Sequence, residues 1–270
     1  MTESFDAEEQ AVLARHKMAV FENRLILDAQ PPVDKQALAK IEGKLAGPLP
    51  QDLLDLWTCS FGGELDYSLE AGFGRHVQSV SFRELFYPDS KAYHDLWGWI
   101  DHEQNLTLEA TDGETSVLEA VPIGGFEYLE RIYVIVEPGP RHGEVLLWCD
   151  GLPPAWPDQL HEASIATIAG SLRELFQKLY LPAYPGTDQD DEFPSGADAL
   201  EEISELDSDH PVEKRVKRKL EQLLSAAVAD WEKMLDAGDG DAGFDMALRY
   251  RFAKCIQTDD AADLSRLLGL

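Results

Sequence analysis

Residues that could carry out chemistry do not occur in the patterns that catalytic sites require. Ser171 follows a glycine but lacks the second glycine of a hydrolase nucleophile elbow. Gly72 and Gly74 lack the third glycine of a dinucleotide-binding loop. The seven histidines show no HExxH spacing, and Cys59 and Cys149 belong to no CxxC pair. We therefore expect a protein that is not an enzyme, with no catalytic residues, no metal site and no cofactor.

Two groups of residues are candidates for contacting a partner. Trp97 and Trp99, with Asp101 close behind them, form an aromatic patch of the kind that anchors protein interfaces, although packing in the core is the favoured alternative. Asp66 and Glu70 alternate with apolar residues, so we expect them on the acidic outer face of a half-buried strand. These five residues are the predicted partner-binding set.

A basic run occupies residues 214–219, where five of the six residues are Lys or Arg. It could be a nucleic-acid patch. In such an acidic chain, however, ion pairs with acids of the same molecule are the favoured interpretation.

The charge of the whole chain limits its partners. Its 270 residues contain 51 Asp and Glu against 23 Lys and Arg, which gives a formal net charge of −28. This excess disfavours direct binding to nucleic acid and to anionic membranes, both of which require clustered cations. The hydrophobic content of 44% is typical of a folded globular protein. The acidic start has neither the positive charge nor the apolar run of a signal peptide, so we expect a cytoplasmic protein.

Hydrophobic periodicity predicts both helices and strands. Helices are expected over residues 6–30, 38–46, 51–59, 164–179 and 212–231, with shorter ones at 244–255 and 264–268. Strands are expected over residues 63–70, 77–82, 117–123, 131–136 and 144–148.

Composition divides the chain into four parts. Residues 181–211 contain ten acids, several Pro, Gly and Ser, and no Lys or Arg, which is typical of a self-repelling linker. We therefore predict an N-terminal helix (1–30), a main domain (31–180), an acidic linker (181–211) and a helical C-terminal segment (212–270).

Several short motifs then follow one another in a recognisable order. They are Leu49-Pro50-Gln51-Asp52-Leu53 before a helix, Phe61-Gly62-Gly63 after it, Val121-Pro122-Ile123-Gly124-Gly125 before an apolar strand, and Gly143-Glu144-Val145 at the next strand. In this order the chain resembles the SUKH superfamily, of the Smi/Knr type. The resemblance assigns structural roles to Pro50, Gly62, Gly63, Pro122 and Gly124. Phe61 departs from the pattern, which usually has asparagine there.

The resemblance implies an α+β fold with a mostly antiparallel sheet flanked by helices, to which this chain adds a C-terminal helical segment. It also implies an intracellular binding protein without catalytic machinery. The favoured function is an immunity protein that neutralises a toxin, most plausibly a nuclease, by occluding its basic active site. The alternative is a regulatory scaffold of the Smi/Knr type that binds proteins of its own cell.

Overall fold

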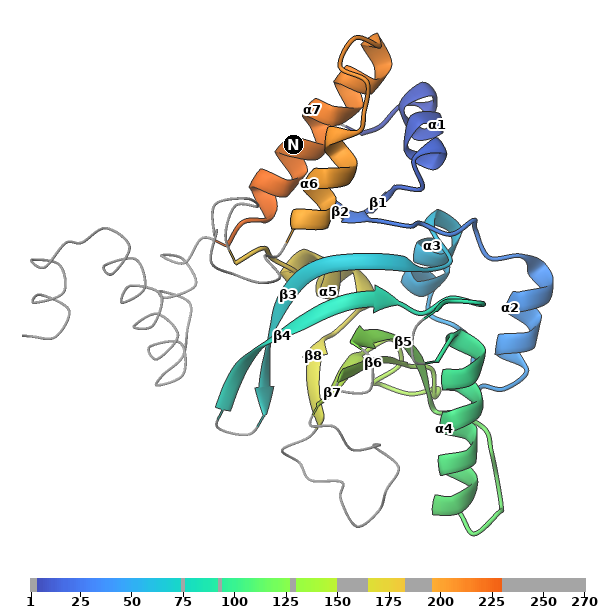
Figure 1. Cartoon of the computed structure of the whole chain (residues 1–270). Coiled ribbons are helices and arrows are strands. Elements are labelled where there is room, and N and C mark those ends of the chain that lie inside the picture. Colours follow the sequence, from blue (N-terminus) through green and yellow to red (C-terminus); the bar gives the residue numbers. More distant parts are fainter. Residues whose placement is uncertain are drawn as a thin grey trace, which may run out of the picture. The chain divides into compact units, whose positions relative to one another are not determined.

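The predicted α+β class is confirmed by a computed structural model, which describes residues 4–73, 76–91, 94–126, 130–149, 165–182 and 196–229. Its main sheet has six strands in the order β3-β4-β5-β6-β7-β8, so each strand lies beside its neighbour in the sequence (Figure 1). The strands are β3 (Gly63–Phe73), β4 (His76–Leu85), β5 (Ala120–Phe126), β6 (Glu130–Ile135), β7 (Val145–Cys149) and β8 (Ile165–Ala169).

The sheet is antiparallel and curls until its two edges approach each other. The pairs from β4 to β8 are all antiparallel, and the predicted hairpin of β6 and β7 is confirmed. Just after β8 and α5, Tyr180 exchanges two backbone hydrogen bonds with Ser68 of β3, at 2.8 and 2.9 Å. Within β5 the register shifts between Pro122 and Gly124, where a Cβ on Gly124 would lie 2.3 Å from the carbonyl oxygen of Glu84.

Helices cover the sheet, and polar caps fix where several of them begin. They are α2 (Lys35–Glu42), α3 (Gln51–Cys59), α4 (Leu96–Ala110) and α5 (Leu172–Lys178). Asp34, Asp95 and Ser171 accept backbone hydrogen bonds at the starts of α2, α4 and α5. The helix predicted over residues 51–59 is confirmed, with Pro50 at its N-cap.

A glycine pair turns the chain from α3 into β3. Gly62 and Gly63 have φ angles of 136° and 145°, a region that favours glycine. A Cβ on Gly62 would lie 2.5 Å from Cβ of Tyr87, and one on Gly63 would lie 2.5 Å from the carbonyl oxygen of Leu27. The turn therefore has no room for a side chain.

The long helix predicted over residues 6–30 is wrong beyond its first turns. The helix α1 (Ala7–Arg15) ends early, and β1 (Ala19–Phe21) and β2 (Arg24–Ile26) form an antiparallel hairpin. Its turn residues Glu22 and Asn23 have φ angles of 47° and 62°, which suit a tight two-residue hairpin turn. The apolar residues of this segment fit both the three-and-four spacing of a helix and the alternating spacing of a strand. The spacing alone therefore did not distinguish the two structures.

The closing helix is also shorter than predicted. Residues 165–169 form β8, and Ser171 rather than Ser164 caps α5. The segment Ile165–Ala169 contains three β-branched residues, which fit a sheet better than a helix. Pairing with β7 decides its conformation.

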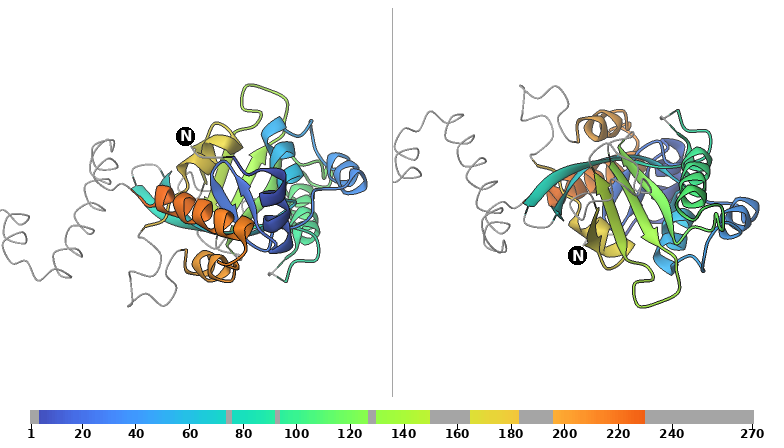
Figure 2. Two further views of the ribbon diagram at one scale, coloured as in Figure 1. Left: turned by 90° about the horizontal axis from the view of Figure 1, so that it is seen from above. Right: turned by 90° about the horizontal axis from the view of Figure 1, so that it is seen from below.

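The division into four parts needs correction. Residues Ala197–Ser204, placed in the linker by composition, form the helix α6, in which Ile203 is buried. The helix α7 (Pro211–Ala227) packs against α1, and the two lie side by side in both views of Figure 2. The N-terminal helix, the main domain and residues 196–228 therefore belong to one compact unit. The helices predicted beyond residue 229 lie outside the described residues.

The basic run on α7 faces acids of α1. Lys219 and Arg215 approach the carboxylate of Glu9 at 2.6 and 3.4 Å. Residues of the basic run thus form ion pairs within the molecule. Their partner Glu9 lies in the N-terminal helix and not in the acidic segment that precedes α7.

Candidate functional site

Asp66 does not lie on an exposed acidic face. Only 6% of Asp66 is exposed, and its carboxylate accepts hydrogen bonds from Arg83 and from the backbone of Gly196, just before α6. The alternation of polar and apolar residues predicts that one face of β3 is exposed to solvent. At Asp66, however, this face is covered. Asp66 is therefore a structural contact to α6.

Trp99 is a core residue. It is 1% exposed, stacks on Phe86 with ring centroids 5.4 Å apart, and has the guanidinium of Arg131 4.5 Å from its ring centroid. An anchor for a partner must be accessible, so Trp99 is excluded from the predicted binding set.

The remaining predicted residues lie apart from one another. Trp97 is half-buried in the first turn of α4, where the ammonium of Lys40 lies 3.5 Å from its ring centroid. Asp101 is exposed and pairs with Lys44 at 2.9 Å. Glu70 is exposed near the far end of β3, away from α4 (Figure 1). Of the five, Trp97 lines a surface depression among the described residues.

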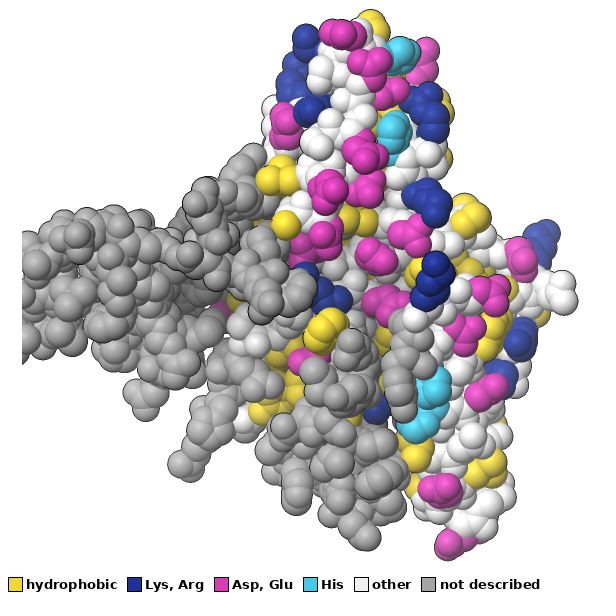
Figure 3. Space-filling view, in the orientation of Figure 1, with side chains coloured by type: hydrophobic (Ala, Val, Ile, Leu, Met, Phe, Trp, Pro, Cys, Tyr) yellow, Lys and Arg dark blue, Asp and Glu magenta, His cyan; other side chains and the backbone are white. Residues whose placement is uncertain are grey.

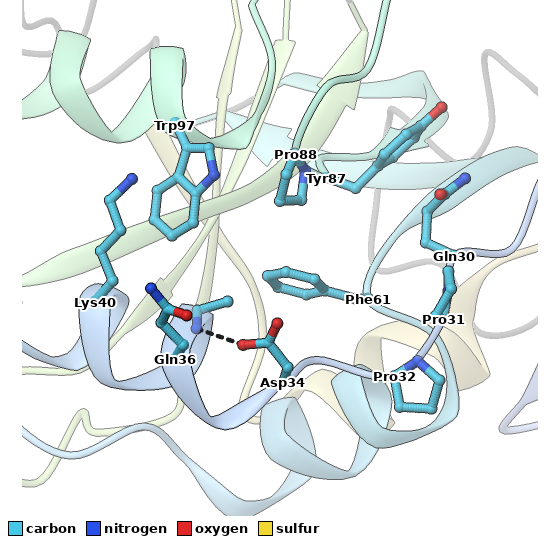
Figure 4. A pocket seen from close by; sticks show the side chains of 11 residues that line it. Gln30, Pro31, Pro32, Asp34, Gln36, Lys40, Phe61, Tyr87, Pro88 and Trp97 are labelled. Atoms are coloured by element: carbon cyan, nitrogen blue, oxygen red, sulfur yellow. Dashed lines mark hydrogen bonds between the residues drawn. The ribbon is translucent and has the colours of Figure 1, made fainter.

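That depression is a groove between α2 and the start of α4, with a volume of about 410 Å³. Figure 4 shows Trp97 beside Lys40 at one end, Phe61 across the middle, and Tyr87 near the opposite end. The other lining residues are Gln30, Pro31, Pro32, Asp34, Gln36, Ala37 and Pro88. Three aromatic rings and three prolines give the groove rigid apolar walls, which lose little conformational entropy on binding.

The local structure explains why these side chains are available. Asp34 accepts a hydrogen bond from the backbone of Ala37 at 2.7 Å, which fixes the start of α2 along one wall. The Gly62-Gly63 turn holds Phe61 at the base, where its ring meets that of Trp57 edge-on at 5.4 Å. Phe61 is the residue that departs from the SUKH pattern.

One hydrogen bond links the groove to a second depression, which we call the acidic hollow. The Tyr87 hydroxyl donates to the carboxylate of Asp28 at 3.0 Å, so a residue of the groove touches a residue of the hollow. The hollow has a volume of about 560 Å³ and is lined by His16, Lys17, Leu27, Asp28, Glu64, Asp198, Glu201 and Glu202. Figure 3 shows acidic side chains gathered on this face of the molecule, over α6 and beside it.

The acids of the hollow are only partly neutralised. Lys17 pairs with Asp28 at 2.8 Å and, with the Tyr87 hydrogen bond, outweighs the effect of burial and lowers the pKa of Asp28. Glu64 has the opposite shift: burial, followed by repulsion from Asp28, Asp198 and Glu202, raises its pKa. The carboxylates of the hollow repel one another. A cationic partner would relieve this repulsion, so the hollow favours such a partner.

Glu84 is a further acid, close enough to Glu64 for the two carboxylates to repel each other. Burial, with a smaller contribution from Glu64, raises its pKa to about 7, while the nearby Ser90 opposes the shift. A cation placed nearby would lower that pKa again, so binding of a basic group would release protons near neutral pH.

The fold and this surface together define an α+β protein with an aromatic groove and an acidic hollow on its surface. No family model, curated protein or solved structure matches the chain. Within the described ranges, no group of three or more His, Cys, Asp or Glu is arranged to hold a metal ion. No helix in that part of the chain is long and apolar enough to cross a membrane.

Sequence reasoning missed most of this surface because its residues come from distant segments. The sequence marked Phe61 only as a departure from a motif. The acids of α6 were assigned to a linker. Trp97 is the residue that the prediction and the observed groove share.

Proposed function

We propose that the protein is a non-enzymatic binding protein that neutralises a basic toxin, most directly a nuclease, by covering its active site. The observation that carries this proposal is the acidic hollow, whose five carboxylates face a single lysine and which joins an aromatic groove. Nucleases hold their anionic substrate with clustered Lys and Arg, so a carboxylate-rich surface complements their active sites.

The two halves of the surface have different roles in this proposal. The net charge of −28 and the hollow would speed association with a cationic partner, because electrostatic steering raises on-rates by about 10- to 1,000-fold at low salt. The groove would supply affinity, because a few desolvated aromatic anchors contribute most of the binding energy of an interface. The resemblance to SUKH proteins supports the same assignment.

The test begins with a partner recovered from the native host or with candidate nuclease toxins co-expressed with this protein. Glu201→Lys with Glu202→Lys reverses two charges in the hollow, and Glu109→Lys with Glu114→Lys makes the same change at exposed positions elsewhere. We expect the first pair to slow association by about tenfold at low salt and to weaken protection of cells. The control pair should change both much less, and the difference should shrink at high salt.

Trp97→Ala tests the groove separately. We expect faster dissociation, with a loss of about 2 kcal/mol or more in binding if the ring is an anchor, and little change in the association rate. Unfolding by urea must show that the variant remains folded. If both charge-reversed pairs behave alike and the recovered partners are acidic proteins bound equally at all salt concentrations, the toxin proposal fails and a Smi/Knr-type scaffold takes its place.

A further inference from the structure

A third depression, which we call the cavity, lies away from the groove and the hollow, between the C-terminal half of α4 and the sheet. It has a volume of about 330 Å³, near the lower limit of the range of about 300–1,000 Å³ found for ligand pockets. Strands β6 and β7 contribute Tyr133, Leu146 and Trp148, and the segment before β5 contributes Val117 and Leu118. These residues form a mainly apolar wall with one phenolic hydroxyl group.

The cavity exists because α4 presents small polar residues where a helix packed on a sheet normally presents large apolar ones. Glu103 and Thr107 of α4 and the C-cap residue Thr111 recur every four residues, so they lie on one side, and all three line the cavity. Leu96 and Ile100, nearer the start of the helix, are fully buried. The helix is thus packed at one end and leaves space at the other.

Three hydroxyl groups that line the cavity donate their hydrogens within the protein. Thr107 donates its hydroxyl hydrogen to the carbonyl of Glu103, and Thr111 donates to the carbonyl of Thr107, both at 2.8 Å. Tyr133 donates to Oε1 of Glu103 at 3.0 Å. Among the described residues, Oε2 of Glu103 makes no hydrogen bond. At Glu103 the cavity therefore offers an acceptor, and a ligand that binds this carboxylate must bring the donor.

A buried charge network holds Glu103 in place. The guanidinium of Arg131 lies 3.6 Å from Oε1 of Glu103, and its central carbon lies 4.5 and 4.7 Å from the ring centroids of Trp99 and Trp148. Burial is the largest influence on the pKa of Glu103 and raises it, while Arg131 opposes that effect. The carboxyl group is thus fixed and poorly solvated. In such an environment a hydrogen bond from a ligand's donor is stronger than in water.

The mouth of the cavity combines an exposed apolar side chain with an exposed acid. Val117, on its rim, is the one large hydrophobic side chain among the described residues that is exposed, at 44%. Glu119, another lining residue, adds an acid that is exposed to solvent. An entering molecule would therefore meet apolar surface and negative charge together.

We infer that this cavity is a binding site for a small primary amine, whose ammonium group donates to Glu103 and whose short apolar body packs against Leu118, Leu146 and Trp148. The lining contains two acids, Glu103 and Glu119, and Arg131, which pairs with Glu103 but does not line the cavity, offsets one of them. The remaining negative charge selects an ammonium group over a neutral donor. The volume admits one ring or a short alkyl chain. This inference is independent of the proposed function.

The experiment compares three probes of similar shape on the full chain: benzylamine, benzyl alcohol and toluene. Binding is measured by calorimetry and by methyl NMR shifts of Leu118 and Leu146. We expect benzylamine to bind about tenfold or more tightly than either neutral probe, because a charge-assisted hydrogen bond adds to the same apolar contact. Equal binding of all three, or binding of none, would overturn the inference.

Variants locate the site. Glu103→Gln should remove the preference for benzylamine, whereas Glu109→Gln, on the exposed side of the same helix, should leave it unchanged. Because Glu103→Gln leaves Arg131 without its anion and can impair folding, Thr107→Leu provides a second test: it fills the cavity and keeps the ion pair. Folded Thr107→Leu protein that still binds benzylamine with wild-type affinity and NMR shifts would place the amine elsewhere and refute the inference.

Discussion

Glu9 is a carboxylate that the fold buries and surrounds with hydrogen-bond donors. It is 1% exposed, accepts from Lys219 at 2.6 Å and approaches Arg215 at 3.4 Å, and it completes a capping box with the backbone of Asp6 at 2.9 Å. Burial raises its pKa, but the bond from Lys219, together with the other partners, outweighs burial and holds the pKa below the ordinary value. One side chain thus joins the N-terminal helix to α7.

We predict that Glu9→Gln lowers the free energy of unfolding by about 1–3 kcal/mol at pH 7, because it removes the anion from a buried, hydrogen-bonded ion pair. A carboxylate whose folded-state pKa is lowered stabilises the protein above its unfolded-state pKa and loses that effect as the pH falls through the folded value. The gap between variant and wild type should therefore shrink below about pH 4.5.

Urea unfolding at several pH values measures this gap. Glu8→Gln is the matched control, since the Glu8 side chain is 76% exposed and 3.8 Å from Arg215, and we expect a change below about 0.5 kcal/mol. Equal effects of the two substitutions would show that Glu9 does not stabilise the fold in the way described here.

At the scale of elements, the Gly62-Gly63 turn links the core to the groove. Its position fixes both Phe61 and Tyr87, which line the groove from segments far apart in the chain. A single backbone requirement therefore affects stability and the binding surface at once.

We predict that Gly62→Ala destabilises the protein by more than about 2 kcal/mol, because the new Cβ meets Tyr87 and the φ angle is unfavourable for alanine. Gly72→Ala is the control within the next strand, since a Cβ there meets nothing within 4 Å. We expect Gly72→Ala to be neutral or slightly stabilising, because alanine reduces the entropy of the unfolded chain. Denaturant unfolding measures the change in the free energy of unfolding for both variants, and equal changes would contradict the prediction.

The helix α7 contributes to the same core as the sheet. Its residues Val216, Leu220 and Leu223 are buried, and Leu181 donates a backbone hydrogen bond to Ala227 at 2.8 Å. The composition of the preceding segment had suggested a separate C-terminal part.

We predict that cutting the chain at a protease site engineered within residues 183–195 leaves two fragments that remain together in gel filtration. The apolar face of α7 and its ion pairs with α1 hold them without a covalent link. A chain ending at residue 182, expressed alone, should expose the surface that α7 covers and should aggregate or unfold. Separation of the cut fragments in the absence of denaturant would contradict the single-unit architecture.

At the scale of the whole molecule, the charge of −28 opposes folding through self-repulsion while favouring encounters with cations. We predict that the midpoint of thermal unfolding rises by several degrees between about 10 and 150 mM NaCl, because screening shortens the reach of repulsion to roughly 8–10 Å. Differential scanning calorimetry at fixed pH measures the shift. Potassium chloride should give the same result, and a midpoint that is constant or falls with salt would contradict the prediction.

Local sequence signals determined much of the fold. The helix at 51–59, the hairpin of β6 and β7, and the main part of α7 follow from periodicity and caps, which act between residues close in the chain. The α+β class was expected from the order of short motifs that resembles the SUKH superfamily. The net charge and the missing catalytic motifs also came from sequence alone. These properties depend on composition or on neighbours within a few residues.

The tertiary structure decided what local patterns left ambiguous. Residues 19–26 and 165–169 fit a helical stripe, yet strand pairing made them β1, β2 and β8. Long-range contacts buried Asp66 beneath α6 and Trp99 beside Phe86, and they brought Phe61, Tyr87 and Trp97 to one groove. Burial and proximity between distant segments depend on how the whole chain packs, so a one-dimensional pattern does not contain them.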